Sequence, residues 1–126
     1  QYNEMSFKVD TEYFKELKNG CSDFQTLDNL LGRSHIVNFG RGGFFPPHRD
    51  LGESIRLIAF LNSDYERSYL LKEDKRINWT PNKLYFFNTK KEHSYFNFAQ
   101  NADVLVLNME VTKKSYDWII SRLSSS

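Results

Sequence analysis

Short runs of apolar and aromatic residues alternate with polar turns along most of the chain, and this alternation predicts a β-rich domain. Strand-like segments recur at short intervals, a pattern that is typical of a sandwich or barrel. The segment Ile55–Leu61 is apolar on both faces except at Arg56, which predicts a strand buried on both sides. We expect strands at His35–Phe39, Phe44–Asp50, Ile55–Leu61, Tyr69–Lys72, Lys83–Phe87, His93–Phe98 and Val104–Val111.

The residues before the strands carry helical signals instead. Asp10 or Thr11 can cap a first helix, which Asn19-Gly20 would end. Ser22, followed three residues later by Gln25, has the spacing of a capping box and predicts a second helix. The N-terminal part, about 10–32, is therefore expected to hold two helices.

Length and periodicity indicate one domain over residues 1–126. A chain of 126 residues can bury one modest core. The β core is expected at about 35–111. A closing amphipathic helix is expected at about 113–123, because apolar residues there recur at helical spacing.

Composition narrows the function classes. Eleven Phe, seven Tyr and two Trp suit a pleated core. Seventeen Lys and Arg against sixteen Asp and Glu leave a net charge of +1, which gives no case for nucleic acid or a membrane surface as partner. No apolar run has membrane-spanning length. Cys21 is the single cysteine, so we expect a reducing, cytoplasmic location.

Two of the three histidines occur where a metal centre could form. His48 and Asp50 are two residues apart, so both side chains share one face of an extended chain, and His93 opens a later strand. Two imidazoles and one carboxylate form the facial ligand set of non-haem Fe(II) oxygenases. Alternatively, His48 is a turn histidine beside two prolines and His93 is a surface residue. We expect His35 to be structural.

Two further residues are candidates for binding a co-substrate. Arg56 is the one charge in an apolar strand, where a guanidinium is costly to bury unless an anion pairs with it. It could hold a carboxylate of a 2-oxo acid, or form an internal salt bridge with Asp64 or Glu110. Asn97 shares a strand face with His93, by period two, and is taken as the second binding residue.

These motifs resemble the Fe(II)/2-oxoglutarate-dependent dioxygenases, most closely the aspartyl/asparaginyl β-hydroxylase-like and prolyl-hydroxylase-like branch. The resemblance implies a double-stranded β-helix, a jelly-roll or cupin-like fold. It also implies His48, Asp50 and His93 as Fe(II) ligands, O2 and 2-oxoglutarate as co-substrates, and a co-substrate role for Arg56. It covers 36–111 and rests on Pro46-Pro47-His48-Arg49-Asp50, Arg56-Leu57-Ile58, Leu84-Tyr85-Phe86-Phe87-Asn88 and His93-Ser94-Tyr95-Phe96-Asn97.

One position departs from the pattern of that family. Its members usually carry an Arg or Lys about ten residues after the distal histidine, where this chain has Asp103. The expected function is hydroxylation of an unactivated C–H in a small-molecule or peptide substrate, on an amino-acid side chain. Two alternatives remain: a cupin-like metalloenzyme that does not use 2-oxoglutarate, and a non-catalytic β-barrel binding domain with a degenerate site. The sequence leaves the oligomeric state open.

Overall fold

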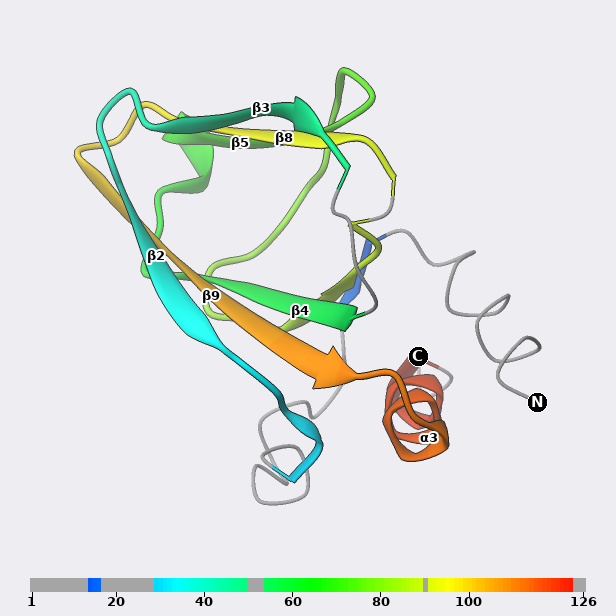
Figure 1. Ribbon diagram of the computed structural model, residues 1–126. Helices are drawn as coiled ribbons and strands as arrows, with labels where there is room; N and C mark the ends of the chain where they lie inside the picture. Colours follow the sequence, from blue (N-terminus) through cyan, green and yellow to red (C-terminus); the bar gives the residue numbers. More distant parts are fainter. Residues whose placement is uncertain (1–13, 17–28, 50–53, 90, 124–126) are drawn as a thin grey trace.

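A computed structural model of the chain describes residues 14–16, 29–49, 54–89 and 91–123. These residues form two antiparallel sheets, a short 3-10 helix and a C-terminal α-helix (Figure 1). The strands are β1 (Phe14–Glu16), β2 (His35–Gly40), β3 (Phe44–His48), β4 (Ser54–Leu61), β5 (Ser68–Lys72), β6 (Lys75–Arg76), β7 (Tyr85–Phe87), β8 (His93–Asn97) and β9 (Asn101–Glu110). The helices are η1 (Tyr65–Arg67) and α3 (Lys113–Leu123).

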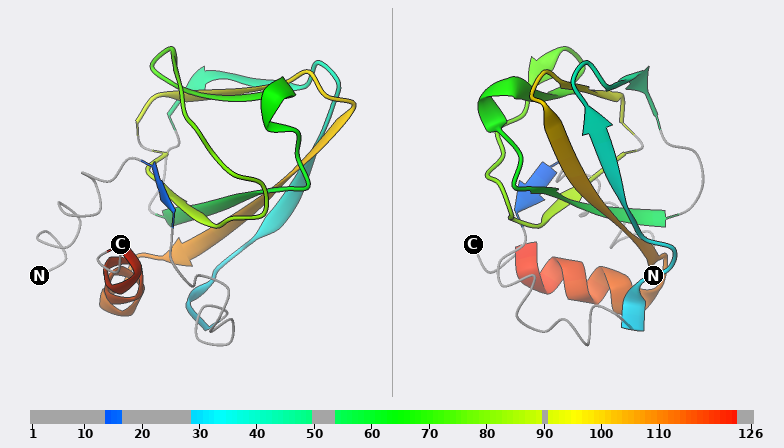
Figure 2. Two further views of the ribbon diagram at one scale, coloured as in Figure 1. Left: turned by 180° about the vertical axis from the view of Figure 1, so that it is seen from behind. Right: turned by 90° about the vertical axis from the view of Figure 1, so that its left-hand side faces the viewer.

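The two sheets face each other across a shared interior. One has the strand order β1-β7-β4-β9-β2, and the other has the order β3-β8-β5-β6. Helix α3 lies against the outer side of the five-stranded sheet, as two further views make clear (Figure 2). The expectation of a mainly β domain with a C-terminal helix is therefore confirmed. None of the helices in the described ranges is long and apolar enough to cross a membrane.

Strand β4 separates the two hydrophobic clusters of the core, because its two faces pack against different elements. Leu57 and Ala59 point outward into the cluster that packs against Trp118 and Ile119 of α3. Ile58 and Phe60 point into the interior between the sheets, where a second hydrophobic cluster forms. Both faces of β4 are covered, as its apolar sequence predicts, because successive side chains of a strand point to opposite sides.

The expectation of two N-terminal helices is not supported. Residues Phe14–Glu16, inside the first predicted helix, are a strand that pairs antiparallel with Tyr85–Phe87. Local helical spacing is a weak preference, and pairing with the open edge of β7 overrides it. Of the second predicted helix, Asn29 and Leu30 are helical. Leu31, the last residue predicted for that helix, forms an isolated antiparallel bridge with Met109. The remaining residues predicted for the two helices lie outside the described part of the chain.

Candidate metal and ligand site

Pairing of β3 with β8 brings the two candidate histidines together. β3 is an edge strand, as its two prolines predict, because proline cannot donate a ladder hydrogen bond. The register with β8 shifts between Phe45 and His48, across those prolines. After the shift His48 lies directly opposite His93. The irregularity therefore sets which β3 residue faces the second histidine.

The two imidazole rings are close, and each is oriented by a backbone carbonyl. Their centres are 4.3 Å apart, with an angle of 54° between the ring planes. Nδ1 of His48 lies 2.6 Å from the carbonyl oxygen of Pro46, and Nδ1 of His93 lies 2.9 Å from that of Lys91. A carbonyl can only accept, so Nδ1 is the donor in each contact, and Nε2 is the nitrogen with which a neutral ring can bind a metal.

This arrangement fits a metal ion held by both Nε2 atoms. Metal-binding histidines commonly donate their other ring N–H to a carbonyl, which fixes the tautomer. Two imidazoles bound to one ion at right angles, at about 2.1 Å, have centres roughly 4–5 Å apart. Within the described residues no group of three or more His, Cys, Asp or Glu side chains is placed to hold a metal. Asp50, the third predicted ligand, lies outside those residues.

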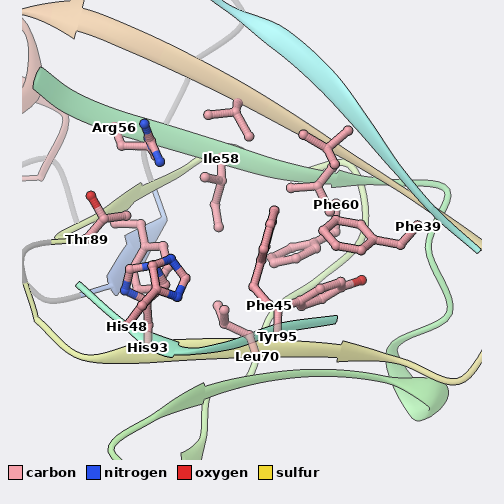
Figure 3. Close-up of a pocket in the computed structure, with 14 residues that line it drawn as sticks. Phe39, Phe45, His48, Arg56, Ile58, Phe60, Leu70, Thr89, His93 and Tyr95 are labelled. Carbon is pink, nitrogen blue, oxygen red and sulfur yellow. The ribbon is translucent and has the colours of Figure 1, made fainter. Parts of the chain in front are cut away.

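Both histidines line a cavity of about 250 Å³ between the sheets. His93 is 7 % exposed and packs against Phe87, with ring centres 5.0 Å apart, whereas His48 is only partly buried. Arg56 and Thr89 lie at the same end of the cavity as the histidines (Figure 3). The cavity therefore has one polar end.

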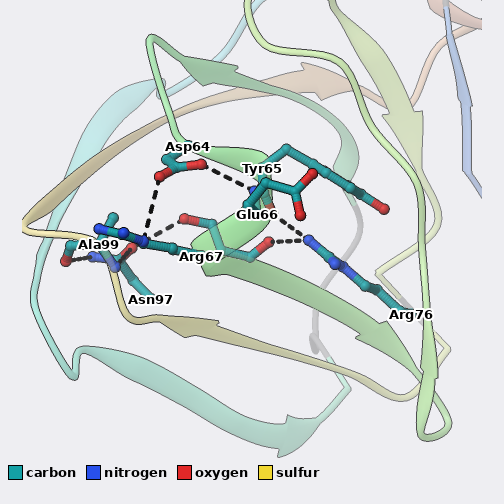
Figure 4. Close-up of polar contacts among 8 residues, drawn as sticks. Asp64, Tyr65, Glu66, Arg67, Arg76, Asn97 and Ala99 are labelled. Atoms are coloured by element: carbon teal, nitrogen blue, oxygen red, sulfur yellow. Dashed lines mark hydrogen bonds and ion pairs between the residues drawn. The ribbon is translucent and has the colours of Figure 1, made fainter.

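Arg56 reaches that polar end from β4, on the inner face of the five-stranded sheet. Its Nε donates to Oδ1 of Asn108, the residue opposite it on β9, at 3.0 Å. Asn108 in turn donates from Nδ2 to the carbonyl oxygen of Arg33 at 2.6 Å. Asp64, one of the two expected salt-bridge partners, instead lies 3.9 Å from Arg67 on the surface (Figure 4). Arg56 is thus held beside the histidines by Asn108.

Asn97 is not among the described residues that line the cavity. It is completely buried, and its Nδ2 donates to the carbonyl oxygens of Phe39, Gly40 and Ala99 at 3.0–3.1 Å. Its Oδ1 accepts hydrogen bonds from Ser68 Oγ and from the Ala99 amide, and the contact with Ala99 is drawn in Figure 4. Every one of these partners is protein. The structure therefore places Asn97 where its amide joins the ends of β2 and β8 and the start of β5, outside the cavity that the histidines line.

Tyr95 also faces the cavity, and its hydroxyl points away from the histidines (Figure 3). The side chain is 5 % exposed, and the hydroxyl makes no hydrogen bond of normal geometry. Burial raises the pKa of Tyr95 above 10.0, and the neighbouring Ser68 hydroxyl offsets this only in part. The neutral phenol is therefore the form that the fold favours.

We expect Tyr95→Phe to raise the free energy of unfolding by about 1 kcal/mol, because it removes a buried hydroxyl without a partner. A tyrosine in the unfolded chain ionises near pH 10, whereas Tyr95 in the fold resists ionisation. The part of the unfolding free energy that is linked to this ionisation is fully present below pH 10 and is lost as the pH rises through the folded pKa. Urea unfolding from pH 8 to 11 should show a shallower alkaline loss in the variant, and equal slopes would contradict this assignment.

Several polar or aromatic contributors to the site were not singled out from the sequence, among them Phe45, Thr89 and Asn108. Asn108 carried a usable signal, because it is the polar residue that follows the apolar run Val104–Leu107. Phe45 and Thr89 carried none, because their place depends on the pairing of distant strands. No known family model matches the sequence, and no curated protein is significantly similar to it.

Proposed function

We propose that this protein is an Fe(II)-dependent oxygenase that consumes a 2-oxo acid and hydroxylates an unactivated C–H. The observation that carries the proposal is the pair of histidine rings, whose centres are 4.3 Å apart and whose Nδ1 atoms each contact a backbone carbonyl, the orientation in which metal-binding histidines present Nε2 to an ion. They stand beside Arg56 in a cavity large enough for a small molecule. Two histidines with a carboxylate suit Fe(II), and Asp50 is the proposed third ligand.

The strand order supports a double-stranded β-helix for the proposed fold. From β2 to β5 each strand crosses to the other sheet, and after the β5-β6 hairpin the crossing resumes through β9. The resulting orders, β7-β4-β9-β2 and β3-β8-β5-β6, put the first and last strands of the core side by side in one sheet. The histidines come from neighbouring strands of the other sheet, one at the end of β3 and one at the start of β8.

The chain's own residues would bind and orient the reactants. The bound metal would supply the redox chemistry that activates O2. Arg56 would pair with the carboxylate of the 2-oxo acid, while Asn108 holds the guanidinium in place. The aromatic walls exclude water. In the overall reaction the 2-oxo acid, O2 and R–H give CO2, a carboxylic acid one carbon shorter and R–OH, so each product acid and alcohol receives one oxygen atom.

Stoichiometric O2 uptake and CO2 release test the proposed function. The full chain is supplied with Fe(II), ascorbate, O2 and one of several 2-oxo acids, and both gases are measured. We expect O2 consumption matched by CO2 release, which stops when iron is chelated. Metal binding without any response to a 2-oxo acid would instead favour the cupin-like metalloenzyme. Absence of metal binding would favour the non-catalytic binding domain.

Arg56→Ala should weaken binding of the 2-oxo acid by about 30-fold, the equivalent of about 2 kcal/mol, because a carboxylate loses its charged partner. Fe(II) affinity should change little, because Arg56 is not a metal ligand. Calorimetric titration of the anaerobic iron form measures both affinities. Arg56→Lys should recover only part of the loss, since lysine keeps the charge but not the planar fork. Unchanged affinity for every 2-oxo acid would assign Arg56 a structural role.

A further inference from the structure

The inner half of the cavity is apolar. Beyond Arg56 the inner face of β4 presents Ile58 and Phe60, and β9 presents Val104 and Val106. Phe39, Phe60 and Tyr95 gather at the end opposite the histidines (Figure 3). The site is therefore polar where a metal would bind and aromatic where the tail of a ligand would lie.

Positive charge is found at only one end of the cavity. Among the described residues that line it, Arg56 is the one Lys or Arg, and it lies beside the histidines. The Tyr95 hydroxyl is the polar group of the aromatic end, and it is neutral. Asp103, at the position where a cation was expected, accepts a hydrogen bond from Asn38 at 2.7 Å. A second ligand carboxylate would thus be buried among aromatic rings without a cation, which is unfavourable.

We infer that the 2-oxo acid used here has a single carboxylate and an aromatic tail, and is not 2-oxoglutarate. This rests on the proposed function. Arg56 and the metal would take the 2-oxo carboxylate head, and the ring would pack edge-to-face or offset against Phe39, Phe60 and Tyr95. A cavity of about 250 Å³ has room for one such molecule. For phenylpyruvate the reaction would give phenylacetate, CO2 and the hydroxylated second substrate.

An anaerobic titration of the full chain loaded with Fe(II) tests this inference. Phenylpyruvate and 2-oxoglutarate are added separately, and the visible charge-transfer band of an iron-chelated 2-oxo acid is recorded. We expect half-saturation with phenylpyruvate at a concentration at least 10-fold lower than with 2-oxoglutarate. If 2-oxoglutarate binds as tightly or more tightly, the inference fails and the proposed function stands. If neither acid produces the band while iron binds, the proposed function fails, and the inference with it.

Neighbouring phenylalanines on β3 provide a matched pair of variants. Phe45 lines the cavity and makes an edge contact with Phe39, with ring centres 5.1 Å apart. Phe44 is 55 % exposed and stacks on Phe96 on the other side of the sheet. We expect Phe45→Ala to weaken phenylpyruvate at least 5-fold without changing 2-oxoglutarate affinity. Phe44→Ala should change neither. Equal losses for both acids in Phe45→Ala would overturn the inference, and both sites are exposed enough to tolerate truncation.

Discussion

Replacing either His48 or His93 with alanine should lower Fe(II) affinity by at least about 100-fold. Loss of a group that merely orients a metal ligand commonly costs 10–100-fold, so loss of the ligand itself should cost no less. The two rings lie opposite each other on β3 and β8 with their centres 4.3 Å apart, and one ring alone cannot form the site. Asp50→Ala should have a comparable effect, because two imidazoles and a carboxylate complete the proposed ligand set.

Iron retained after anaerobic gel filtration measures this loss directly. His35 provides the control, because it is exposed on β2 and pairs there with Val106. His35→Ala should therefore retain as much iron as the natural sequence. Because His93 is buried, circular dichroism must show that its variant still folds, and His93→Gln offers a second, polar replacement. A folded His93 variant with undiminished iron would refute the metal site.

Asn97→Ala should destabilise the fold by about 3–4 kcal/mol, which corresponds to a fall in Tm of about 11–15 °C for a domain of this size. The substitution leaves three carbonyl oxygens, a hydroxyl and an amide without the partner that they share in the folded protein. The carbonyl and amide groups lie in or beside the turns after β2 and β8, and the hydroxyl belongs to Ser68 at the start of β5. Thermal unfolding followed by circular dichroism measures the change.

Asn38→Ala is the matched control for this loss. The Asn38 amide also donates a hydrogen bond, to Asp103, but it is exposed to water. Its removal should cost less than about 1 kcal/mol, because water replaces the lost partner. If Asn97→Ala kept its Tm and instead lost affinity for a 2-oxo acid, Asn97 would be the co-substrate ligand that its strand position suggested.

The strands could be predicted because their signals are local. An apolar run such as Ile55–Leu61 reports burial on both faces wherever it occurs, and the fold supplies a helix on one side and a second sheet on the other. The segment around Phe14 was wrongly predicted as helical because the helical signals used there are also local. The pairing of β1 with β7 depends instead on residues far along the chain. Edge pairing of this kind leaves no mark in the segment itself.

For the candidate site, the sequence could predict only which side chains share a face of a strand. A lone charge in an apolar strand singled out Arg56, which lies on the inner face of β4 and lines the cavity. The two-residue period of a strand also predicted Asn97 on the same face as His93, but sharing a face does not make two residues close in space. Four residues of strand span about 13 Å, so Asn97 lies far from the metal end. The register shift that sets His48 opposite His93 could not be read from the prolines alone.

Imidazole nitrogen NMR during metal addition tests the central claim most directly. Before metal is added, long-range proton–nitrogen spectra should show His48 and His93 protonated at Nδ1. On addition of one equivalent of diamagnetic Zn(II) as a probe, the Nε2 resonances of both residues should shift together, while those of His35 stay in place. A response confined to one histidine, or a His35 response equal to theirs, would contradict a metal centre built from His48 and His93.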